Sequence, residues 1–167
     1  MRRRRRITRA RLLELLHYDS ETGEFRWQER VSRSVKVGDL AGLTDSEGYR
    51  QITIKGRAYR AHQLAWFYMT GKWCTVVIDH RDGDPSNNRW DNLRPATISQ
   101  NNANRRPNRN NKSGFKGVVQ HHIGRWCARI KKNGRRYHLG SFASPQEAHA
   151  AYVAAARKLF GEFARAE

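Results

Sequence analysis

Helices are expected at four places in the chain, and apolar residues mark three of them. Three leucines recur at helical intervals near the start, so a short amphipathic helix is expected over residues 8–17. Residues 61–70 are apolar enough for a buried helix, and Gly71 is expected to end it as a C-terminal cap. A third helix is expected over residues 97–105 and a fourth over residues 144–160.

Strands are predicted where apolar and polar residues alternate with a period of two. Residues 49–55 alternate in this way, Gly56 turns the chain, and residues 57–60 run back, which is typical of a β-hairpin. Residues 18–27 place polar turn residues between aromatic ends and predict another hairpin. The glycine-containing stretch over residues 31–48 is expected to form irregular loops with a short strand.

The last third of the chain has its own pattern. Residues 118–119, 126–131 and 135–139 are three short strand-like runs, and the Asn-Gly pair at 133–134 indicates a hairpin turn between the last two. The helix expected over residues 144–160 begins with a Ser-Pro-Gln-Glu capping box and ends at a glycine. Its small alanines would let it lie close against a sheet. The fold class expected for the whole chain is therefore α+β.

Charge indicates the kind of partner. Lys plus Arg total 33 against 15 Asp plus Glu, a net charge of +18, which suits a nucleic acid better than an acidic protein. Basic side chains that neutralise phosphates release condensed counterions and so drive this affinity. The run from Arg2 to Arg6 is read either as a phosphate-touching arm or as a solvated tail. A basic protein that binds RNA, such as a ribosomal one, remains an alternative.

Other features bear on compartment and partners. No apolar run approaches the roughly 18 residues that a membrane helix needs, and the basic start has no apolar signal core. Cys74 and Cys127 are too few for a disulfide framework or a four-cysteine zinc site. A soluble cytoplasmic protein with reduced thiols, in a bacterial or phage-infected cell and without a membrane partner, is expected.

The candidate chemistry lies after a short apolar strand that ends in Asp79 and His80. Asp79 is a hard oxygen ligand suited to Mg²⁺ or Mn²⁺, and His80 is suited to accept a proton from water near neutral pH. Because adjacent strand residues point to opposite faces, Asp79 is assigned to the metal and His80 to the base. Asn92 is expected to orient the His80 ring, and Asn101 to complete the metal site from the helix over residues 97–105.

The same residues have simpler interpretations. The Asp-Gly-Asp sequence at 82–84 is also typical of a turn whose carboxylates cap backbone groups. Asn87 and Asn88 are equally well explained as turn residues only. From the residues alone, the choice between a metal site and a capped turn stays open.

A longer pattern favours the metal site, because residues 49–106 resemble the HNH endonucleases of phages and homing elements. The matching residues are His62–Gly71, Ile78–His80, Gly83, Asn87–Arg89, Asp91–Arg94 and Ser99–Asn101. The resemblance implies a ββα-metal unit in which His80, Asn92 and Asn101 occupy the motif positions. Many members have His at the position of Asn101, and an amide oxygen there favours Mg²⁺ or Mn²⁺ over Zn²⁺.

Residues 113–163 resemble the DNA-binding domain of plant ethylene-response transcription factors, which places a three-stranded sheet in the major groove with a helix packed behind it. The residues that carry the likeness include Gly114–Val118, Gly124–Trp126, Ala128–Ile130, Leu139–Phe142 and Glu147–Ala155. Residue parity independently predicts that Arg129, Lys131, Arg136 and His138 leave one face of the sheet. The resemblance implies a reading face that includes Lys116, Val119, His121, Ile123, Arg129, Lys131, Arg136 and His138, and Arg125 is also expected to bind DNA. These basic side chains are expected either to read bases or only to contact phosphates.

Four regions are expected. An N-terminal helix and hairpin region that contacts DNA spans residues 1–48, the HNH nuclease unit 49–106, a linker 107–112, and the three-stranded sheet with its helix 113–167. Arg50, Arg57 and Arg60 are expected to bind DNA from the exposed face of the second hairpin.

The function that fits these expectations is metal-dependent hydrolysis of double-stranded DNA by a homing or phage-encoded endonuclease. The cofactor would be one Mg²⁺ or Mn²⁺ ion, and a monomer would nick one strand whereas a double-strand break would need a dimer. The alternative is a non-catalytic, sequence-specific DNA-binding regulator.

Overall fold

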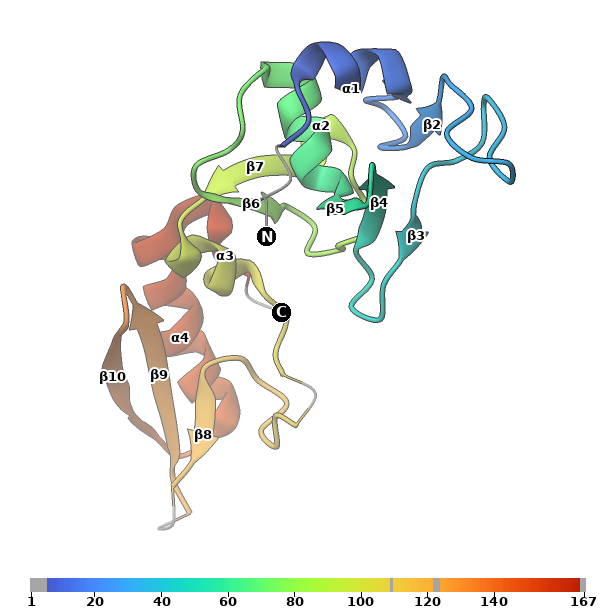
Figure 1. The fold of residues 1–167 in the computed structure, drawn as a ribbon. Coiled ribbons are helices and arrows are strands. Elements are labelled where there is room, and N and C mark those ends of the chain that lie inside the picture. The colour runs from blue at the N-terminus through green and yellow to red at the C-terminus, as the bar shows by residue number, and fades with distance from the viewer. Residues whose placement is uncertain (1–5, 109, 122–123, 166–167) are drawn as a thin grey trace, which may run out of the picture. The chain divides into compact units, whose positions relative to one another are not determined.

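The computed structural model describes residues 6–108, 110–121 and 124–165, and Figure 1 shows its helices and strands in chain order. Contacts between residues divide the chain into two compact units, Met1–Pro95 and Ala96–Glu167. The first unit contains the predicted N-terminal region and most of the predicted nuclease unit. The second contains the rest, including the helix that carries Asn101.

The first unit begins with a short helix and a hairpin. Helix α1 (Arg9–Leu15) starts at Thr8, whose side chain accepts a hydrogen bond from the backbone N–H of Arg11. Strands β1 (Leu16–Tyr18) and β2 (Phe25–Trp27) pair antiparallel and alternate buried and exposed side chains. The predicted helix and hairpin are therefore confirmed, although the helix ends earlier than expected because residue 16 already belongs to a strand.

A three-stranded sheet and a buried helix follow. Strand β3 (Leu43–Thr44) pairs with β4 (Arg50–Ile54), which forms the predicted hairpin with β5 (Arg57–Arg60). Helix α2 (Ala61–Thr70) begins directly after β5 and ends at Gly71, which adopts the left-handed conformation expected of a C-terminal cap (φ 71°).

The core of the first unit joins these elements. It is formed by side chains from α1, both hairpins, α2 and the short sheet that follows it. The fully buried large members are Leu12, Leu16, Phe25, Ile52 and Leu64. The N-terminal region, expected mainly as a DNA-contact region, thus supplies much of the hydrophobic core on which the candidate site rests.

The last sheet of the first unit has two strands, β6 (Val77–His80) and β7 (Leu93–Ala96), joined by a loop that contains the single-turn 3₁₀ helix η1 (Trp90–Asn92). Ile78 and Leu93 anchor the two strands in the core. The backbone N–H of Arg81 donates to the carbonyl oxygen of Asn92 at 2.8 Å, which closes the base of the loop. The two ends of the loop are therefore held in fixed positions by the strands.

The second unit is a sheet backed by one long helix, as predicted. Strands β8 (Val118–Gln120), β9 (Trp126–Lys132) and β10 (Arg135–Phe142) form an antiparallel sheet in the order β10-β9-β8. At the turn between β9 and β10, Asn133 and Gly134 both have positive φ, 49° and 82°. This is the geometry that an Asn-Gly hairpin turn requires.

Helix α4 (Pro145–Phe160) packs across this sheet and leads into the short 3₁₀ helix η2 (Gly161–Phe163). Ser144 caps α4 by accepting a hydrogen bond from the N–H of Glu147. A Cβ atom on Gly117 would lie 2.0 Å from the Tyr152 ring, so glycine is needed for the helix to approach the sheet.

Helix α3 (Ile98–Asn104), which carries Asn101, packs in the second unit. Thr97 and Gln100 form a reciprocal capping box at its start. Its Ala103 belongs to the same hydrophobic cluster as Ile130 and Tyr152. The structural boundary between the compact units therefore precedes α3, whereas the sequence pattern placed α3 at the end of the nuclease unit.

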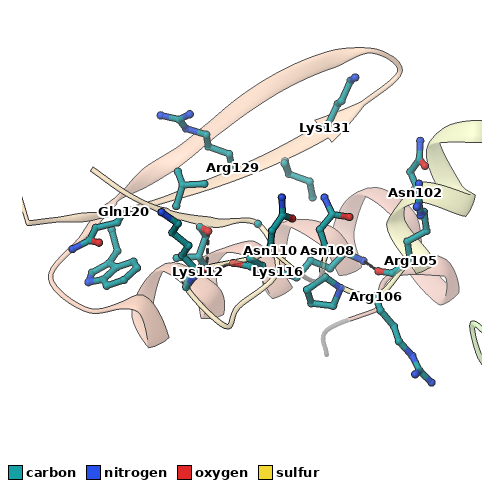
Figure 2. Close-up of a pocket in the computed structure, with 18 of the residues that line it drawn as sticks. Asn102, Arg105, Arg106, Asn108, Asn110, Lys112, Lys116, Gln120, Arg129 and Lys131 are labelled. Atoms are coloured by element: carbon teal, nitrogen blue, oxygen red, sulfur yellow. Dashed lines mark hydrogen bonds between the residues drawn. The ribbon is translucent and has the colours of Figure 1, made fainter. Parts of the chain in front are cut away.

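Residues 105–113, here called the arm, run from α3 toward the sheet. The described residues of the arm line a cavity together with residues of β8, β9 and β10 (Figure 2). No element of regular secondary structure forms in the described part of the arm. The arm contains the predicted linker of residues 107–112, and its described residues lie beside the sheet that follows.

Candidate functional site

Asp79 and His80 end strand β6, and both side chains are buried, at 3% and 5% exposed. Burial of two ionisable side chains next to each other is costly unless each has a polar partner. Their partners come from strand β7 and from the loop between the strands. The site can therefore be built from the contacts of these two residues.

The partner of Asp79 is Arg94 on β7. The Nε of Arg94 donates to Oδ2 of Asp79 at 2.9 Å, and both side chains are almost completely buried. The contact gives this buried carboxylate an oppositely charged partner and fixes its direction. The sequence offered one signal for this pair, because a basic residue in a short buried strand needs an acidic partner.

The partner of His80 is Asn88. The Nε2 atom of His80 lies 3.2 Å from Oδ1 of Asn88, and Nδ2 of Asn88 donates to the carbonyl oxygen of Ser86 at 3.0 Å. The amide is thereby oriented with its oxygen toward the ring, so Nε2 carries the proton. The basic lone pair of the neutral imidazole then lies on Nδ1.

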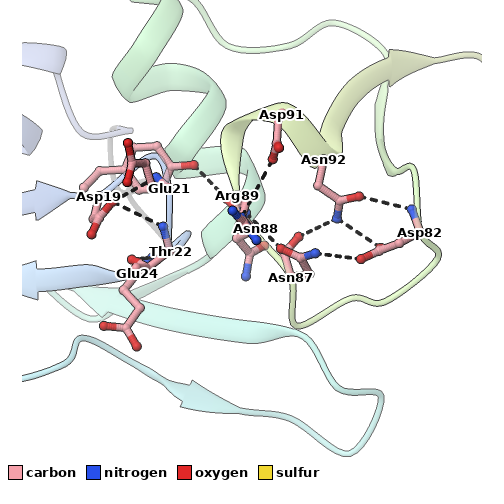
Figure 3. A network of polar contacts seen from close by, with 11 residues as sticks. Asp19, Glu21, Thr22, Glu24, Asp82, Asn87, Asn88, Arg89, Asp91 and Asn92 are labelled. Atoms are coloured by element: carbon pink, nitrogen blue, oxygen red, sulfur yellow. Dashed lines mark hydrogen bonds and ion pairs between the residues drawn. The ribbon is translucent and has the colours of Figure 1, made fainter.

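Asn92 has a different role from the one expected. Its Oδ1 accepts from the backbone N–H of Asp82 at 3.1 Å, and its Nδ2 donates to Oδ1 of Asp82 and to the carbonyl oxygen of Asn87. Figure 3 shows these contacts crossing the loop. The expectation that Asn92 orients the His80 ring is wrong, because its amide is directed at Asp82 while Asn88 occupies the position beside the ring.

The turn at residues 82–84 is capped by its own carboxylates, as one interpretation of the sequence held. Oδ1 of Asp82 accepts from the N–H of Asp84 at 2.8 Å, and Oδ1 of Asp84 accepts from the N–H of Ser86 at 2.9 Å. Asp82 also accepts from Nδ2 of Asn87 at 2.7 Å. The hydrogen bonds give the loop one geometry and leave Asp79, rather than Asp82, as the carboxylate next to His80.

The N-terminal hairpin supports this loop from outside. The hydroxyl of Tyr18 donates to the carbonyl oxygen of Asn88 at 2.7 Å, and the N–H of Trp90 donates to the carbonyl oxygen of Ser20 at 3.0 Å. Gly23 lies so close that a Cβ atom would come within 2.4 Å of the Asn88 carbonyl carbon. Asn88 is therefore held on both its backbone and its side chain.

The surroundings of His80 keep its imidazole neutral. Burial lowers the pKa of His80 below its usual value, and the Asn88 contact and the neighbouring acids only partly offset this effect. The ring of His62, at the start of α2, meets the His80 ring edge-on at 5.1 Å between centroids. Burial lowers the pKa of His62 to about 3, with smaller contributions from His80 and Arg60. Both imidazoles are uncharged at neutral pH.

Asn101 lies on α3, in the second compact unit. Its side chain is partly exposed. The structure therefore brings Asp79, His80 and the loop of Asn92 together in one unit, while the place of Asn101 beside Asp79 stays a prediction. Carboxylate and amide oxygens form a chemical set that suits Mg²⁺ or Mn²⁺.

The four basic side chains predicted to share one face of the C-terminal sheet do share it. In the antiparallel register, Arg129 pairs with His138 and Lys131 pairs with Arg136. All four are exposed, while the intervening Ile130 is buried. These four residues are called the basic face below.

Lys116, which the family resemblance placed on the reading face, has partners inside the second unit, and its contact with DNA stays a prediction. Its Nζ donates to the carbonyl oxygens of Ala103 and Arg105, the latter at 2.6 Å, at the C-terminal end of α3. Burial lowers the pKa of Lys116 to about 8. The side chain is an internal contact of the second unit, because the ammonium satisfies carbonyls that the helix end leaves without partners.

Other predicted DNA-binding residues are partly engaged within the protein. Nη2 of Arg125 donates to the carbonyl oxygen of Ser141 at 2.9 Å, while His121 lies in the turn between β8 and β9. Val119 is exposed on β8, at 42%. Ile123 lies outside the described residues, as do Arg2 to Arg5. Contact of any of these residues with DNA stays a prediction.

The arginines of the second hairpin are also held internally. Arg50 donates to the carbonyl oxygens of Ala41 and Gly42, at 2.8 and 3.1 Å. Arg60 lies 4.0 Å from the centre of the Tyr49 ring and forms ion pairs with Asp45 and Glu47. Both guanidinium groups therefore have partners within the protein, and contact of these arginines with DNA stays a prediction.

Arg57, the third arginine of this hairpin, lies over the Tyr59 ring at 5.4 Å.

No helix in the described parts of the chain combines the length and the apolar character that a membrane crossing requires.

Comparison with known proteins finds a family match for the region around Asp79 and His80. A family model described as HNH endonuclease matches residues 59–103, which include β6, the loop, β7 and α3 up to Ala103. An uncharacterized HNH endonuclease of Acanthamoeba polyphaga mimivirus is 33% identical over 89 residues, which cover 53% of this chain and 46% of that protein. Asp79, His80, Asn92 and Asn101 all lie within the family match.

The C-terminal region has separate relatives. An AP2/ERF and B3 domain-containing transcription factor of Arabidopsis thaliana is 48% identical over 54 residues, 32% of this chain and 15% of that protein. Dehydration-responsive element-binding protein 2A of the same plant is 41% identical over 58 residues, 34% of this chain and 17% of that protein. The chain thus spans less than half the length of each of these curated relatives.

One solved structure, described as DNA binding and cleavage by the HNH homing endonuclease I-HmuI, is 28% identical. It covers 49% of this chain and 46% of its own, at a TM-score of 0.37, which is too low to establish a shared arrangement. The assignment rests on the family match and the contacts around His80 instead. Residues 59–103 match the HNH endonuclease family, and the C-terminal region resembles AP2/ERF DNA-binding domains.

Proposed function

We propose that this protein is a divalent-metal-dependent endonuclease that hydrolyses double-stranded DNA, with His80 as the general base. The observation that supports this most directly is the environment of His80. The ring is buried beside Asp79, kept neutral by burial, and oriented through Nε2 by Asn88. A neutral imidazole with a fixed tautomer is what a base near neutral pH requires.

In this mechanism Nδ1 of His80 accepts the proton of the attacking water. Asn88 holds the opposite nitrogen, so the ring does not rotate when the proton arrives, and its amide oxygen can stabilise the imidazolium that forms. Asn92 acts by fixing the loop through Asp82, which keeps Asn88 in place. It is thus a positioning residue rather than a contact of the ring.

Asp79 and Asn101 would hold the metal ion. When bound, a divalent ion supplies electrostatic stabilisation for the charge that develops on the scissile phosphate and on its leaving oxygen. Arg94 fixes the direction of the Asp79 carboxylate. Both proposed ligands provide hard oxygen atoms, so Mg²⁺ or Mn²⁺ is the expected cofactor.

Binding of DNA is proposed to come from the basic face of the C-terminal sheet. Lys131 lies directly opposite Arg136 on the neighbouring strand, and like charges in that relation destabilise a sheet. An anionic partner relieves this repulsion. Arginine also matches the two acceptors that guanine presents in the major groove. Two linked binding regions gain avidity through effective concentration, so neither needs to bind tightly alone.

The number of strands cut follows from the number of centres. A monomer with one His80 centre is expected to nick one strand, and a double-strand break would need a dimer or a second binding event.

A plasmid-nicking assay with Mg²⁺ or Mn²⁺, with and without EDTA, tests the proposal. His80→Ala should slow cleavage by about 10²- to 10⁴-fold, the usual contribution of a general base. His17→Ala is the matched control, because His17 is an exposed histidine on β1, and it should cut at the parent rate.

Two outcomes would contradict the proposal. If His80→Ala cuts as fast as the parent, His80 is not the base. If no divalent ion supports cleavage while DNA binding persists, the protein acts as a DNA-binding regulator instead.

A further inference from the structure

The arm is fixed to the second unit at both of its ends. At its start, Lys116 donates to the carbonyl oxygen of Arg105 at 2.6 Å. Near its end, Nδ2 of Asn111 donates to the carbonyl oxygen of Phe115 at 2.9 Å, and the hydroxyl of Ser113 lies 2.9 Å from the carbonyl oxygen of Val118. The arm is therefore held to the second unit through the backbone of Arg105 at its start and through the side chains of Asn111 and Ser113 near its end.

A cavity of about 870 Å³ lies between the arm and the sheet (Figure 2). Its cationic lining comes from both sides: Arg105, Arg106 and Lys112 from the arm, and Arg129, Lys131 and Arg136 from the sheet. No acidic side chain lines it among the described residues. Figure 2 shows the side chains of Arg129 and Lys131 extending from the sheet and those of Asn108 and Asn110 extending from the arm.

The positive charge of this groove is not neutralised within the protein. In the parts of the chain that the structure describes, none of the ion pairs involves Arg106, Lys112 or the basic face. In contrast, Arg11, Arg60 and Arg94 in the first unit each have an acidic partner. Cations that face each other across a groove repel, and an anion between them removes that cost.

The lining also indicates the kind of anion. Pockets for small molecules are mostly apolar with a few polar groups, whereas cations and amides dominate here. Amide groups such as those of Asn108 and Gln120 donate hydrogen bonds to phosphate oxygens. Cations and neutral donors along both sides of a groove suit the repeated phosphates of a nucleic-acid strand.

We propose that this groove holds one sugar–phosphate strand of duplex DNA, with the arm on one side of the strand and the basic face on the other. The arm, which the sequence presents as a linker, is thereby a second DNA-binding surface. The inference rests on the proposed function insofar as duplex DNA is the substrate. It adds phosphate contacts from residues 105–113 that the sheet alone cannot make.

The test compares two double variants of the full chain with equal changes in charge. The arm variant is Arg106→Gln with Lys112→Gln. The control variant is Arg157→Gln with Lys158→Gln, because these exposed residues in the last turn of α4 do not line the groove. Affinity for a duplex of about 30 base pairs is measured in EDTA at several salt concentrations, so that cleavage plays no part.

Each phosphate contact contributes about 0.9 to the slope of log affinity against log salt concentration. The arm variant should therefore lower the slope by about 1.8 and weaken binding at least several-fold, while the control variant changes the slope by less than half as much. Equal slopes and affinities for the two variants would overturn the inference.

A third variant separates this inference from the proposed function. Arg129→Gln with Lys131→Gln removes cations of the sheet. If the sheet variant weakens binding and the arm variant matches the control, the arm inference is wrong and binding by the sheet stands. If the sheet variant also matches the control, the DNA surface lies elsewhere and both proposals fail. Unchanged thermal unfolding of each variant confirms that affinity, not folding, has been altered.

Discussion

The nuclease loop (residues 81–92) and the groove of the second unit use polar residues in opposite ways. In the loop, Asp82, Asn87 and Asn92 hydrogen-bond to one another, and Asn88 bonds to His80. Around the groove, basic side chains face each other without acidic partners in the described structure. Chemistry on a phosphate needs atoms in fixed positions, which requires satisfied contacts. Affinity for a polyanion needs charge that the fold has not already neutralised.

The largest effect is expected from removing the contact between Asn88 and the proposed general base, His80. Asn88→Ala takes away the acceptor for Nε2 of His80, so the tautomer and the ring orientation are no longer set. We expect a 10- to 100-fold lower single-turnover rate, by analogy with residues that orient metal-bound histidines. Affinity for DNA, measured in EDTA, should stay unchanged.

A matched variant distinguishes orientation from simple unfolding. Asn87→Ala removes a neighbouring amide that contacts Asp82 but not the ring. It should lower the rate by less than Asn88→Ala at a similar melting temperature. Equal rates for the two variants would show that Asn88 does not position the base.

Within the second unit, Lys116 contacts the protein itself, whereas Lys131 belongs to the basic face. Lys116→Met keeps the apolar stem but removes the donor to two carbonyl oxygens at the end of α3, so it should lower the free energy of unfolding by about 1–3 kcal/mol. Lys131→Met should change stability by no more than about 0.5 kcal/mol and weaken DNA binding instead. Denaturant unfolding and DNA titration on both variants measure the contrast. Loss of DNA affinity without loss of stability in Lys116→Met would contradict the structural role.

The buried histidine His62 makes folding of the first unit sensitive to acid. Its pKa is about 3 in the folded protein and near 6.5 when unfolded. Between these values the unfolded state binds the extra proton, so stability falls as pH decreases below 6.5. From pH 7 to pH 5 this one group should cost on the order of 1–2 kcal/mol.

His62→Gln, which cannot titrate, should lose that part of the pH dependence. Urea unfolding at pH 7 and pH 5 checks it, because the parent should lose more stability than the variant. An identical loss in both proteins would mean that His62 is protonated equally in the folded and unfolded states.

The smallest expected effect is on the pH profile of cleavage. Because burial lowers the pKa of His80, the neutral base persists below its ordinary pKa of 6.5. The rate should therefore fall only as pH drops through a midpoint below 6.5, and change less than about twofold between pH 6.5 and 7.5. A midpoint at or above 6.5 in single-turnover rates would contradict the assigned environment.

The sequence predicted elements well where one local pattern determines them. The hairpin at β4 and β5, the glycine that ends α2, the Asn-Gly turn and the shared face of Arg129, Lys131, Arg136 and His138 all follow from period, turn chemistry or parity. Asp79 and His80 were singled out mainly through the resemblance to HNH endonucleases, because the residues alone left open the choice between a metal site and a capped turn.

Partners that come from distant parts of the chain were not predictable in the same way. The choice between Asn88 and Asn92 as partner of His80 depends on how a loop of a dozen residues folds, and Tyr18 contributes from 70 residues away. Lys116 was expected on the DNA-reading face from the family resemblance. The local sequence does not locate the end of α3, to which its ammonium group donates. No local pattern records such contacts.

The position of Ala103 has a consequence for recombination between genes. Its small side chain lies in a cluster with Ile130, Tyr152 and Phe160, so the helix that bears Asn101 is supported by the DNA-binding sheet and its helix. A crossover placed in the arm would separate α3 from that support. Functional chimaeras with a new recognition domain should therefore have their junction upstream of Thr97. Asn101, the last candidate metal ligand, would then come from the parent that supplies the recognition domain.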